Sequence, residues 1–265
     1  MDVQLRDKCV VITGGSAGIG KGLAMQYLAE GCFVAVCGRG EQALTAFENE
    51  CAAAGYGDRF LAFQADVTDN NAMRSFRDAV LTRFGRLDIW VNNAGVTLRN
   101  LLMDATEEEW RTMMDVNLRS VWQCAKLAAE HMREAGGGVI VNTSSYASKS
   151  PKMGSGLYAA SKWGVSCLTR SLAGELAPSN IRVFGFLPGV VMSEMTKAVL
   201  ARNPEAVEKE AAVRRYARPE DIAPVVVFLS SPLASYVTGV DIDVSGGKFC
   251  IQNPDMPWSG AEIPR

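Results

Sequence analysis

Short runs of β-branched and other apolar residues alternate along the chain with longer segments that repeat apolar positions at helical spacing. Strands separated by helices in this way form βαβ units, whose strands lie parallel in one sheet. The pattern predicts seven strands, over Cys9–Thr13, Phe33–Cys37, Phe60–Ala65, Leu87–Val91, Val139–Thr143, Ile181–Leu187 and Asp241–Val244.

The intervening segments predict helices over Gly18–Ala29, Glu41–Ala54, Asn70–Phe84, Glu107–Asn117, Ser120–Glu134, Ser155–Ala177 and Pro219–Phe228. The strands are apolar throughout, which is typical of a parallel sheet covered by helices on both faces. No repeat or linker divides the chain. We therefore expect one α/β domain over residues 1–265, a doubly wound (Rossmann) sheet of seven parallel strands, with a substrate loop at about 190–215 and a C-terminal tail at 248–265.

Composition narrows the class of protein. The chain has 265 residues, of which 48% are hydrophobic and 21% charged, with a formal net charge of −2. That balance gives no reason to expect nucleic acid or a membrane as a partner. The start, MDVQLRDKCV, does not resemble a signal peptide, and no apolar run approaches the ~20 residues that span a bilayer. Seven irregularly spaced cysteines are typical of reduced thiols, so we expect a cytoplasmic protein.

The histidine content limits the chemistry further. His131 is the single histidine, at the end of a predicted helix, where we interpret it as a surface residue. A serine hydrolase needs a histidine to accept the proton of its nucleophile, and zinc sites need several His or Cys ligands. We therefore expect no metal.

The first predicted strand runs into ITGGSAGIG, residues 12–20. Gly14-x-Ser16-x-Gly18 matches the nucleophile elbow of a hydrolase, which would also need a histidine and an oxyanion loop. The alternative is a phosphate-binding turn, in which glycines let the backbone approach a pyrophosphate at the N-terminus of a helix. The position directly between strand and helix favours the phosphate-binding turn.

Residues that follow other strands extend the same site, because ligands of such sheets bind at the carboxyl ends of the strands. After the second strand come Gly38 and Arg39. NAD sites usually place an acidic residue there, whereas a guanidinium can pair with the 2′-phosphate of NADP. Arg39 thus favours NADP(H), with NAD(H) possible, unless Arg39 is a solvated residue at a helix start.

The third and fourth strands are each followed by residues with two interpretations. Asp66, followed by Val67, could accept a hydrogen bond from an adenine amino group or cap the next helix. Asn92-Asn93-Ala94-Gly95 could let a ribose approach the backbone, or form a plain turn.

The fifth strand ends in Thr143-Ser144-Ser145, and Tyr158 and Lys162 follow on a predicted helix. Tyr158 and Lys162 are four residues apart, so they share one helix face. An ammonium near a phenol favours the phenolate and lowers its pKa, which would make Tyr158 a usable acid near neutral pH. A half-buried Tyr beside a snorkelling Lys would give the same pattern.

Taken together, these motifs resemble the short-chain dehydrogenase/reductase family over about Leu5–Gly247. The motifs are TGGSAGIG, NNAG, DVNL with Asn117, NTSS with Ser145, YAASK at Tyr158–Lys162, and PG at Pro188–Gly189. The resemblance implies an oxidoreductase acting on a ketone or a secondary alcohol. It implies that Tyr158 is the general acid and that Ser145 binds the substrate oxygen. It also implies that Lys162 binds the nicotinamide ribose and lowers the pKa of Tyr158. Asn117 would hold a water for proton relay.

The resemblance also implies which residues line the cofactor site. They are Gly14, Ser16, Gly18, Ile19, Gly20, Gly38, Arg39, Asp66, Val67, Asn93, Ala94, Gly95, Thr143, Tyr158, Lys162, Pro188, Gly189, Val191 and Ser193. Three positions depart from the family pattern. Ala17 replaces a base common in NADP-using members, Phe184 replaces an Asn that makes a structural hydrogen bond, and Ser193 replaces a Thr.

Substrate choice is expected to lie with Thr97, Leu98, Tyr146, Lys149, Met153, Val190, Met192 and the segment Met195–Arg214. Most of these residues are apolar, which suits a ketone with hydrophobic flanks, and the segment NNAGVTLRNLLMDATEEEW is similar to 3-oxoacyl-acyl-carrier-protein reductases. The tail carries Phe249, Ile251, Met256 and Trp258, so we expect it to pack on a surface. The family implies a homotetramer built partly on the helix that contains Tyr158. Two alternatives stay open: an NAD-dependent alcohol, hydroxysteroid or polyol dehydrogenase, and a non-enzymatic dinucleotide-binding regulator.

Overall fold

The computed structural model describes residues 2–193, 196–197, 201, 204–248, 250, 254 and 256–260. Met195, at the start of the expected substrate segment, lies outside the described residues, as do Phe249 and Ile251 of the tail.

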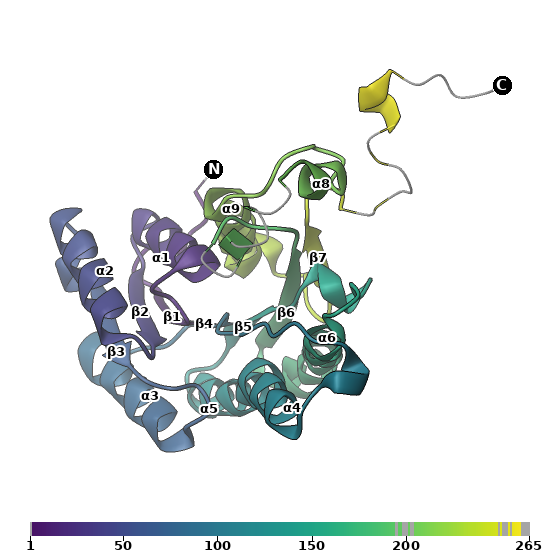
Figure 1. Ribbon diagram of the computed structural model, residues 1–265. Helices are drawn as coiled ribbons and strands as arrows, with labels where there is room; N and C mark the ends of the chain where they lie inside the picture. Colours follow the sequence, from purple (N-terminus) through teal and green to yellow (C-terminus); the bar gives the residue numbers. More distant parts are fainter. Residues whose placement is uncertain are drawn as a thin grey trace.

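A seven-stranded parallel sheet forms the centre of the molecule (Figure 1), which confirms the predicted fold class. Its strand order is β3-β2-β1-β4-β5-β6-β7. The strands are β1 Cys9–Thr13, β2 Phe33–Gly38, β3 Phe60–Gln64, β4 Ile89–Asn92, β5 Gly138–Thr143, β6 Ile181–Pro188 and β7 Asp241–Val244. The order reverses between β1 and β4, so the loops after these two strands diverge and leave a crevice at their carboxyl ends.

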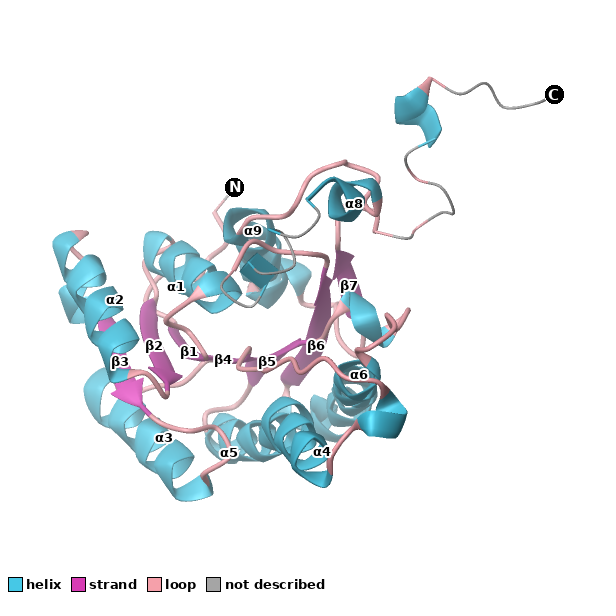
Figure 2. Cartoon of the chain, in the orientation of Figure 1, coloured by secondary structure: helices cyan, strands magenta, loops and turns pink. Residues whose placement is uncertain are grey.

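Helices cover both faces of the sheet (Figure 2). One face carries α1 Gly18–Ala29, α2 Glu41–Ala53 and α9 Pro219–Ser230, and the other carries α3 Asn70–Phe84, α4 Glu107–Met114, α5 Ser120–Glu134 and α6 Gly156–Leu176. A short helix, α8 Pro204–Lys209, lies near the carboxyl ends of β6 and β7. The described residues also form single 3-10 turns: η1 Gly57–Arg59, η2 Leu102–Asp104, η4 Tyr146–Ser148, η5 Ala177–Ser179, η6 Pro232–Ala234 and η7 Met256–Ser259.

Successive side chains of each strand point to opposite faces of the sheet, so each strand contributes to two core clusters, one on each face. In β1, Val10 and Ile12 pack with the α1, α2 and α9 side, whereas Cys9 and Val11 pack with the α3, α5 and α6 side. Phe184 of β6 is fully buried in the first of these clusters. A large apolar side chain therefore fills the place where the family pattern has an Asn.

The helix predicted over Glu107–Asn117 differs from the structure. It begins with a capping box between Thr106 and Glu109, as α4, but it changes at Asp115 into a π-helical turn, η3 Asp115–Arg119, that leads into α5. The wider turn places Asn117 at the centre of this junction, where it is fully buried.

All seven cysteines carry free thiols. Cys9, Cys32, Cys37, Cys51 and Cys124 are buried, and burial raises the pKa of each, to about 12 for Cys32 and about 11 for Cys51. Cys167 and Cys250 are exposed.

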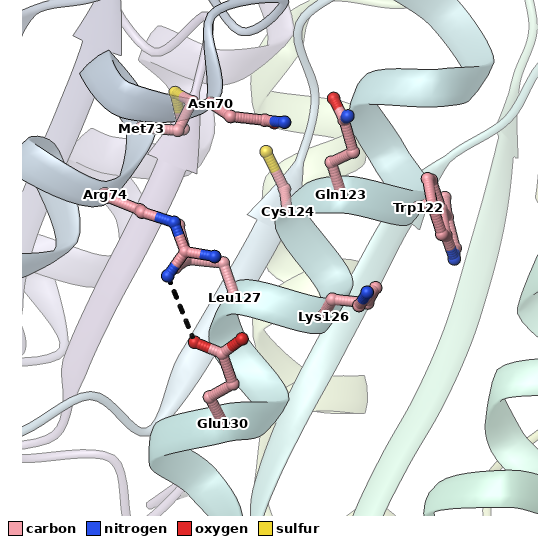
Figure 3. A pocket seen from close by; sticks show the side chains of 9 residues that line it. All are labelled: Asn70, Met73, Arg74, Trp122, Gln123, Cys124, Lys126, Leu127 and Glu130. Carbon is pink, nitrogen blue, oxygen red and sulfur yellow. Dashed lines mark ion pairs between the residues drawn. The ribbon is translucent and has the colours of Figure 1, made fainter.

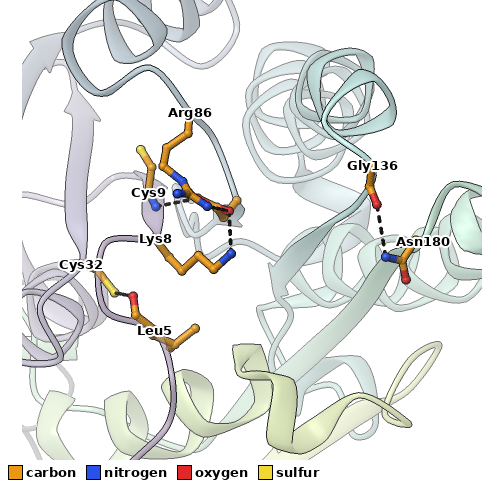
Figure 4. Close-up of polar contacts among 8 residues, drawn as sticks. Leu5, Lys8, Cys9, Cys32, Arg86, Gly136 and Asn180 are labelled. Atoms are coloured by element: carbon orange, nitrogen blue, oxygen red, sulfur yellow. Dashed lines mark hydrogen bonds and ion pairs between the residues drawn. The ribbon is translucent and has the colours of Figure 1, made fainter.

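Polar contacts at the amino ends of the strands are structural (Figure 4). Asp88 accepts hydrogen bonds from the Cys9 amide at 2.8 Å and from Arg86 at 2.6 and 2.7 Å, and pairs with Lys8 at 3.3 Å. Burial acts to raise the pKa of Asp88, but these donors outweigh it and lower the pKa. The carboxylate thus ties β1 to the start of β4.

No helix among the described residues is long and apolar enough to cross a membrane.

Candidate active site

The loop between β1 and α1 forms an open cradle. Gly14 and Gly18 have φ of 64° and 52°, which favour glycine. Ala17 is the N-cap of α1 and makes no side-chain cap hydrogen bond. The first amides of α1 are therefore left for a ligand, and the helix dipole makes this end attractive to an anion.

A set of hydrogen bonds holds this loop against the one that follows β4. The buried Thr13 hydroxyl accepts hydrogen bonds from the amides of Asn93 and Ala94, both at 3.0 Å. The Asn93 side chain donates in return to the carbonyls of Thr13 and Gly14, at 3.0 and 3.1 Å. Gly20 lies beneath this clamp, since a Cβ there would come 2.6 Å from Asn93 Nδ2. Asn93 and Gly20 thus shape the cradle, and the sequence did not point to the part played by Thr13.

A serine hydroxyl and an exposed arginine are found at the end of β2. A Cβ on Gly38 would lie 3.5 Å from Ser16 Oγ, so the Ser16 side chain faces this strand end. Arg39 follows directly and is exposed, and its carbonyl accepts from Gln64 at 3.0 Å.

Of the two interpretations of Asp66, helix capping is wrong. The N-cap of α3 is Asp69, which accepts from the amides of Asn71 and Ala72. Asp66 Oδ1 instead accepts from the Thr68 amide and hydroxyl, at 2.9 and 2.7 Å, which fixes the turn after β3.

Asn117 connects three elements through its side chain. Its Oδ1 accepts from the Val96 amide at 2.8 Å, and its Nδ2 lies 2.9 Å from the Val96 carbonyl and 3.1 Å from Ser161 Oγ of α6. Gly95 lies against this group, since a Cβ there would be 3.2 Å from Asn117 Oδ1 and 3.5 Å from Lys162 Nζ. The π-helical turn therefore positions the loop after β4 beside α6.

Lys162 and Tyr158 share one face of α6, as predicted. Lys162 is buried, and its ammonium donates to the Thr143 carbonyl at 2.7 Å and lies 6.0 Å from the centroid of the Tyr158 ring. Burial lowers the pKa of Lys162 to about 8. Burial also raises the pKa of the Tyr158 phenol, and a hydrogen bond with Ser145 partly offsets this. The expected lowering of the Tyr158 pKa by Lys162 is thus not found, because burial dominates and the ammonium is engaged by Thr143.

Two cavities meet at Tyr158. The first, of about 240 Å³, is lined by Gly14, Ala17, Gly18, Ile19, Asn93, Ala94, Gly95, Thr143, Ser144, Tyr158, Lys162, Pro188 and Ser193. The second, of about 260 Å³, shares Tyr158 and Pro188 with the first and also contains Ser145. A Cβ on Gly18 would lie 3.2 Å from Ser193 Cβ, so the loop after β6 closes over the cradle.

Most of the expected cofactor residues line the first cavity, whereas Ser16, Gly20, Gly38, Arg39, Asp66 and Val67 do not. Gly189 lines the second cavity, and Val191 is buried in the core. The Thr143 hydroxyl is a buried oxygen with no hydrogen-bond partner among the described residues. Positive-φ glycines, an uncapped helix start and an unpartnered hydroxyl together fit an extended phosphate-bearing ligand.

The second cavity differs from the expected substrate site. Thr97, Tyr146 and Val190 line it as expected. Lys149 instead pairs with Asp243 at 3.0 Å, Met153 is 87% exposed, and neither Leu98 nor Met192 lines it. The cavity also contains Glu210 from the expected segment Met195–Arg214, and the structure adds three charged residues that the sequence did not single out: Arg99, Lys152 and Lys248.

Both Lys248, which pairs with Glu210, and Trp258 connect the tail to the body. Trp258 Nε1 donates to the Ala212 carbonyl at 3.2 Å, and Arg214 lies over its ring, but 63% of Trp258 stays exposed. Within the described residues, the tail thus contacts the segment between α8 and α9, to which Glu210, Ala212 and Arg214 belong.

A further hollow lies between α3 and α5 (Figure 3). Arg74 pairs there with Glu130 at 3.7 Å, and burial raises the pKa of the Cys124 thiol to about 12. An ion pair and a protonated thiol do not form a reactive set, so we assign no chemistry to this hollow.

The hydrolase alternative for Ser16 is wrong on geometry. His131 lines a hollow at the amino ends of the strands together with Lys8 and Arg86, whereas Ser16 lies at the carboxyl ends. Ser16 therefore has no histidine to accept its proton.

Comparisons with known proteins agree with this arrangement. A family model described as enoyl-(acyl carrier protein) reductase matches residues 14–248. The 3-oxoacyl-[acyl-carrier-protein] reductase of Staphylococcus aureus is 39% identical over 244 residues, which cover 91% of this chain and 98% of that protein. The corresponding protein of Chlamydia pneumoniae is 37% identical, over 93% and 99% of the two chains.

Solved structures show the same fold. A short-chain type dehydrogenase/reductase from Mycobacterium marinum is similar with a TM-score of 0.88 and 33% identity, over 94% of this chain and 98% of that one. A 7α-hydroxysteroid dehydrogenase, in complex with NADH and 7-oxo glycochenodeoxycholic acid, has a TM-score of 0.88 and 33% identity over 93% and 96%. This chain therefore belongs to the short-chain dehydrogenase/reductase family and is an NAD(P)-dependent oxidoreductase.

Proposed function

We propose that this protein is an NADP(H)-dependent carbonyl reductase, working in reverse as a secondary-alcohol dehydrogenase, with Tyr158 as its general acid and base. The observation that carries this proposal is the position of Tyr158, which lines both cavities and shares the second with Ser145. A carbonyl carbon in the second cavity would there lie between a proton donor and a nicotinamide in the first.

The cradle would hold the cofactor through the amides at the start of α1 and through the loops after β4 and β6. Lys162 and Asn93 line this cavity, and the nicotinamide ribose would bind beside Lys162, whose ammonium lies 6.0 Å from the centroid of the Tyr158 ring. Thr143, Pro188, Gly189, Val191 and Ser193 would contact the nicotinamide end. When bound, the cofactor supplies the hydride that reduces the carbonyl carbon.

The remaining steps belong to this chain. Ser145 would donate a hydrogen bond to the substrate oxygen and hold it beside the Tyr158 hydroxyl, which gives its proton as the alkoxide forms. Asn117 would keep Gly95 and α6 in register beside Lys162, and a water held near this group would return a proton from solvent. A raised Tyr158 pKa suits an acid that is protonated at neutral pH.

The preference for NADP(H) over NAD(H) rests on Arg39. Arg39 is exposed at the end of β2, and Ser16 Oγ faces the adjoining Gly38, so a guanidinium and a hydroxyl are available to a 2′-phosphate. Ala17 offers no second base. The solved hydroxysteroid dehydrogenase contains NADH, so NAD(H) use is the second candidate. The relatives from Staphylococcus aureus and Chlamydia pneumoniae are named as 3-oxoacyl-[acyl-carrier-protein] reductases. A 3-oxo compound is therefore among the first substrates to test.

We expect a homotetramer, as the family resemblance implied. Exposed aromatic side chains on the helices of one face, Trp122 of α5 and Trp163 of α6, are 43% and 67% exposed and would contact a neighbouring subunit.

The test is replacement of Tyr158 by Phe. Loss of the phenol removes the proton donor, and we expect turnover of a 3-oxo thioester with NADPH to fall at least ~10²-fold. NADPH binding, followed by its fluorescence, should change little. Tyr236→Phe is the matched control, because Tyr236 is fully exposed. Near wild-type turnover in Tyr158→Phe would contradict the mechanism, and NADPH binding without turnover of any carbonyl would favour a regulator.

A further inference from the structure

The second cavity carries an excess of positive charge. Among its lining residues are three cationic side chains, Arg99, Lys152 and Lys248, and one carboxylate, Glu210. They come from four distant parts of the chain: the loop after β4, the loop before α6, the segment after α8, and the residues after β7. Only the fold brings them together.

Glu210 lies between the two lysines. Its carboxylate pairs with Lys152 Nζ at 3.1 Å and with Lys248 Nζ, and the Lys248 side chain is only 10% exposed. Lys248 Nζ also lies 5.6 Å from the centroid of the Tyr146 ring. One carboxylate is thus shared by two ammonium groups, one of them nearly removed from water.

The positive charge of Arg99 is not paired with Glu210 in the way that the charges of the two lysines are. Within the part of the chain that the structure describes, its guanidinium makes no hydrogen bond or ion pair, and Arg99 is exposed in the wall of the cavity. A planar guanidinium is well suited to hold a carboxylate or phosphate through two parallel hydrogen bonds.

A purely structural role explains only part of this cluster. Glu210 with one lysine would be enough to tie the segment after α8 to the cavity wall. Lys152 is 65% exposed beside the shared carboxylate, and Arg99 adds a further exposed positive charge, so the cavity wall attracts anions. An anion in the cavity would restore the balance.

We infer that the substrate carries an anionic group, a carboxylate or a phosphate, bound by Arg99, Lys152 and Lys248 while its carbonyl lies against Tyr158 and Ser145. This inference rests on the proposed carbonyl chemistry and names the class of substrate. The cavity of about 260 Å³ limits the part of the substrate inside it to a small molecule. It also adds a charged group to the expected ketone with hydrophobic flanks.

Paired substrates test the inference directly. Initial rates with NADPH are measured for acetoacetate, 4-oxopentanoate and 5-oxohexanoate, each against its methyl ester, and for dihydroxyacetone phosphate against dihydroxyacetone. We expect the wild-type enzyme to prefer the anion in at least one pair. In Arg99→Ala and in Lys152→Met, kcat/KM for that anion should fall about tenfold or more, the effect of losing one hydrogen bond to a charged group. The rate with the neutral partner should stay within about twofold.

Lys149→Met is the matched control. Lys149 is three residues from Lys152, but it pairs with Asp243 and does not line the cavity. The ratio of anion to neutral compound should be unchanged in this variant. Equal or better rates with the neutral compounds in the wild type, or an equal loss in Lys149→Met, would overturn the inference.

A binding measurement separates this inference from the proposed function. Calorimetric titration of 4-oxopentanoate and of dihydroxyacetone phosphate into the enzyme with NADP⁺ requires no turnover. Binding that weakens in Arg99→Ala and Lys152→Met, but not in Lys149→Met, supports the anion site even if no carbonyl is reduced. Absence of turnover with intact anion binding would refute the proposed function alone. Binding of neither anion, or binding unaffected by all three variants, would refute the anion site.

Discussion

Replacing Thr13 by Val removes one hydroxyl from the junction of the two loops that form the cradle. Val has nearly the same shape as Thr and suits a strand end, so the change leaves packing almost intact. It deprives the amides of Asn93 and Ala94 of their acceptor, and both hydrogen bonds are 3.0 Å long in a place where Thr13 is only 2% exposed.

The expected loss follows from these two amides. A buried donor left without a partner costs about 1–3 kcal/mol. The loop after β4 is only partly buried, so water can reach one of the amides. We therefore expect Thr13→Val to lower the free energy of unfolding by about 2–4 kcal/mol. Thr13→Ser keeps the acceptor and loses one methyl group, which should cost about 1 kcal/mol.

Urea-induced unfolding followed by circular dichroism measures both variants. Protein concentration must be held constant, because assembly of subunits would contribute to stability. A Val variant within about 1 kcal/mol of the wild type, or a Ser variant as damaging as the Val variant, would refute the idea that Thr13 Oγ1 supports this loop.

Three further predictions concern the cofactor, the acid stability and the cradle. Arg39→Ala should weaken NADPH binding about tenfold or more and leave NADH binding nearly unchanged, as measured by fluorescence titration, because only NADPH has a phosphate for this guanidinium; an equal effect on both would refute the assignment. Asp88→Asn should lower the free energy of unfolding at pH 7 by about 1–3 kcal/mol. The folded-state pKa of Asp88 lies below its unfolded value, so this difference should be present above that unfolded value and fade in urea titrations as the pH falls through the folded-state pKa; a constant difference down to pH 2 would contradict it. Gly20→Ala should destabilise the protein and weaken cofactor binding, since its Cβ would come 2.6 Å from Asn93 Nδ2. At Gly174 on α6 a Cβ meets nothing within 4 Å, so Gly174→Ala should stabilise the protein by up to about 1 kcal/mol. The opposite ranking of the two variants in thermal unfolding would count against the packing described.

Much of the fold was predictable because the periodicity of the sequence is strong. The predicted bounds of α1, α3, α5, β1 and β7 agree with the structure, since each is flanked by a change of hydrophobic period or by a turn residue. The π-helical turn at Asp115–Arg119 was not predicted, because one extra residue in a helix hardly disturbs its apolar pattern.

The candidate site was predictable where its residues are close in sequence. Tyr158 and Lys162 lie on one helix face, as their spacing indicated, and the glycines of the cradle follow β1 directly. The pKa of Tyr158 was not predictable, because it depends on burial that the sequence does not report. The cationic residues of the second cavity were missed for a related reason: Arg99 and Lys248 are more than a hundred positions apart and line one cavity only in the folded chain.

The unequal exposure of the seven cysteines allows selective labelling of this enzyme. Thiolates, not thiols, react with maleimides and peroxide, and the five buried sulfurs are both shielded and held protonated. A dye added under mild conditions should therefore attach at Cys250 at the start of the tail. It should reach Cys167 only in dissociated subunits, because Cys167 lies one turn after Trp163 on α6, on the face proposed to contact a neighbouring subunit. After Cys167→Ser, a fluorophore on Cys250 would report how the tail responds as substrate enters.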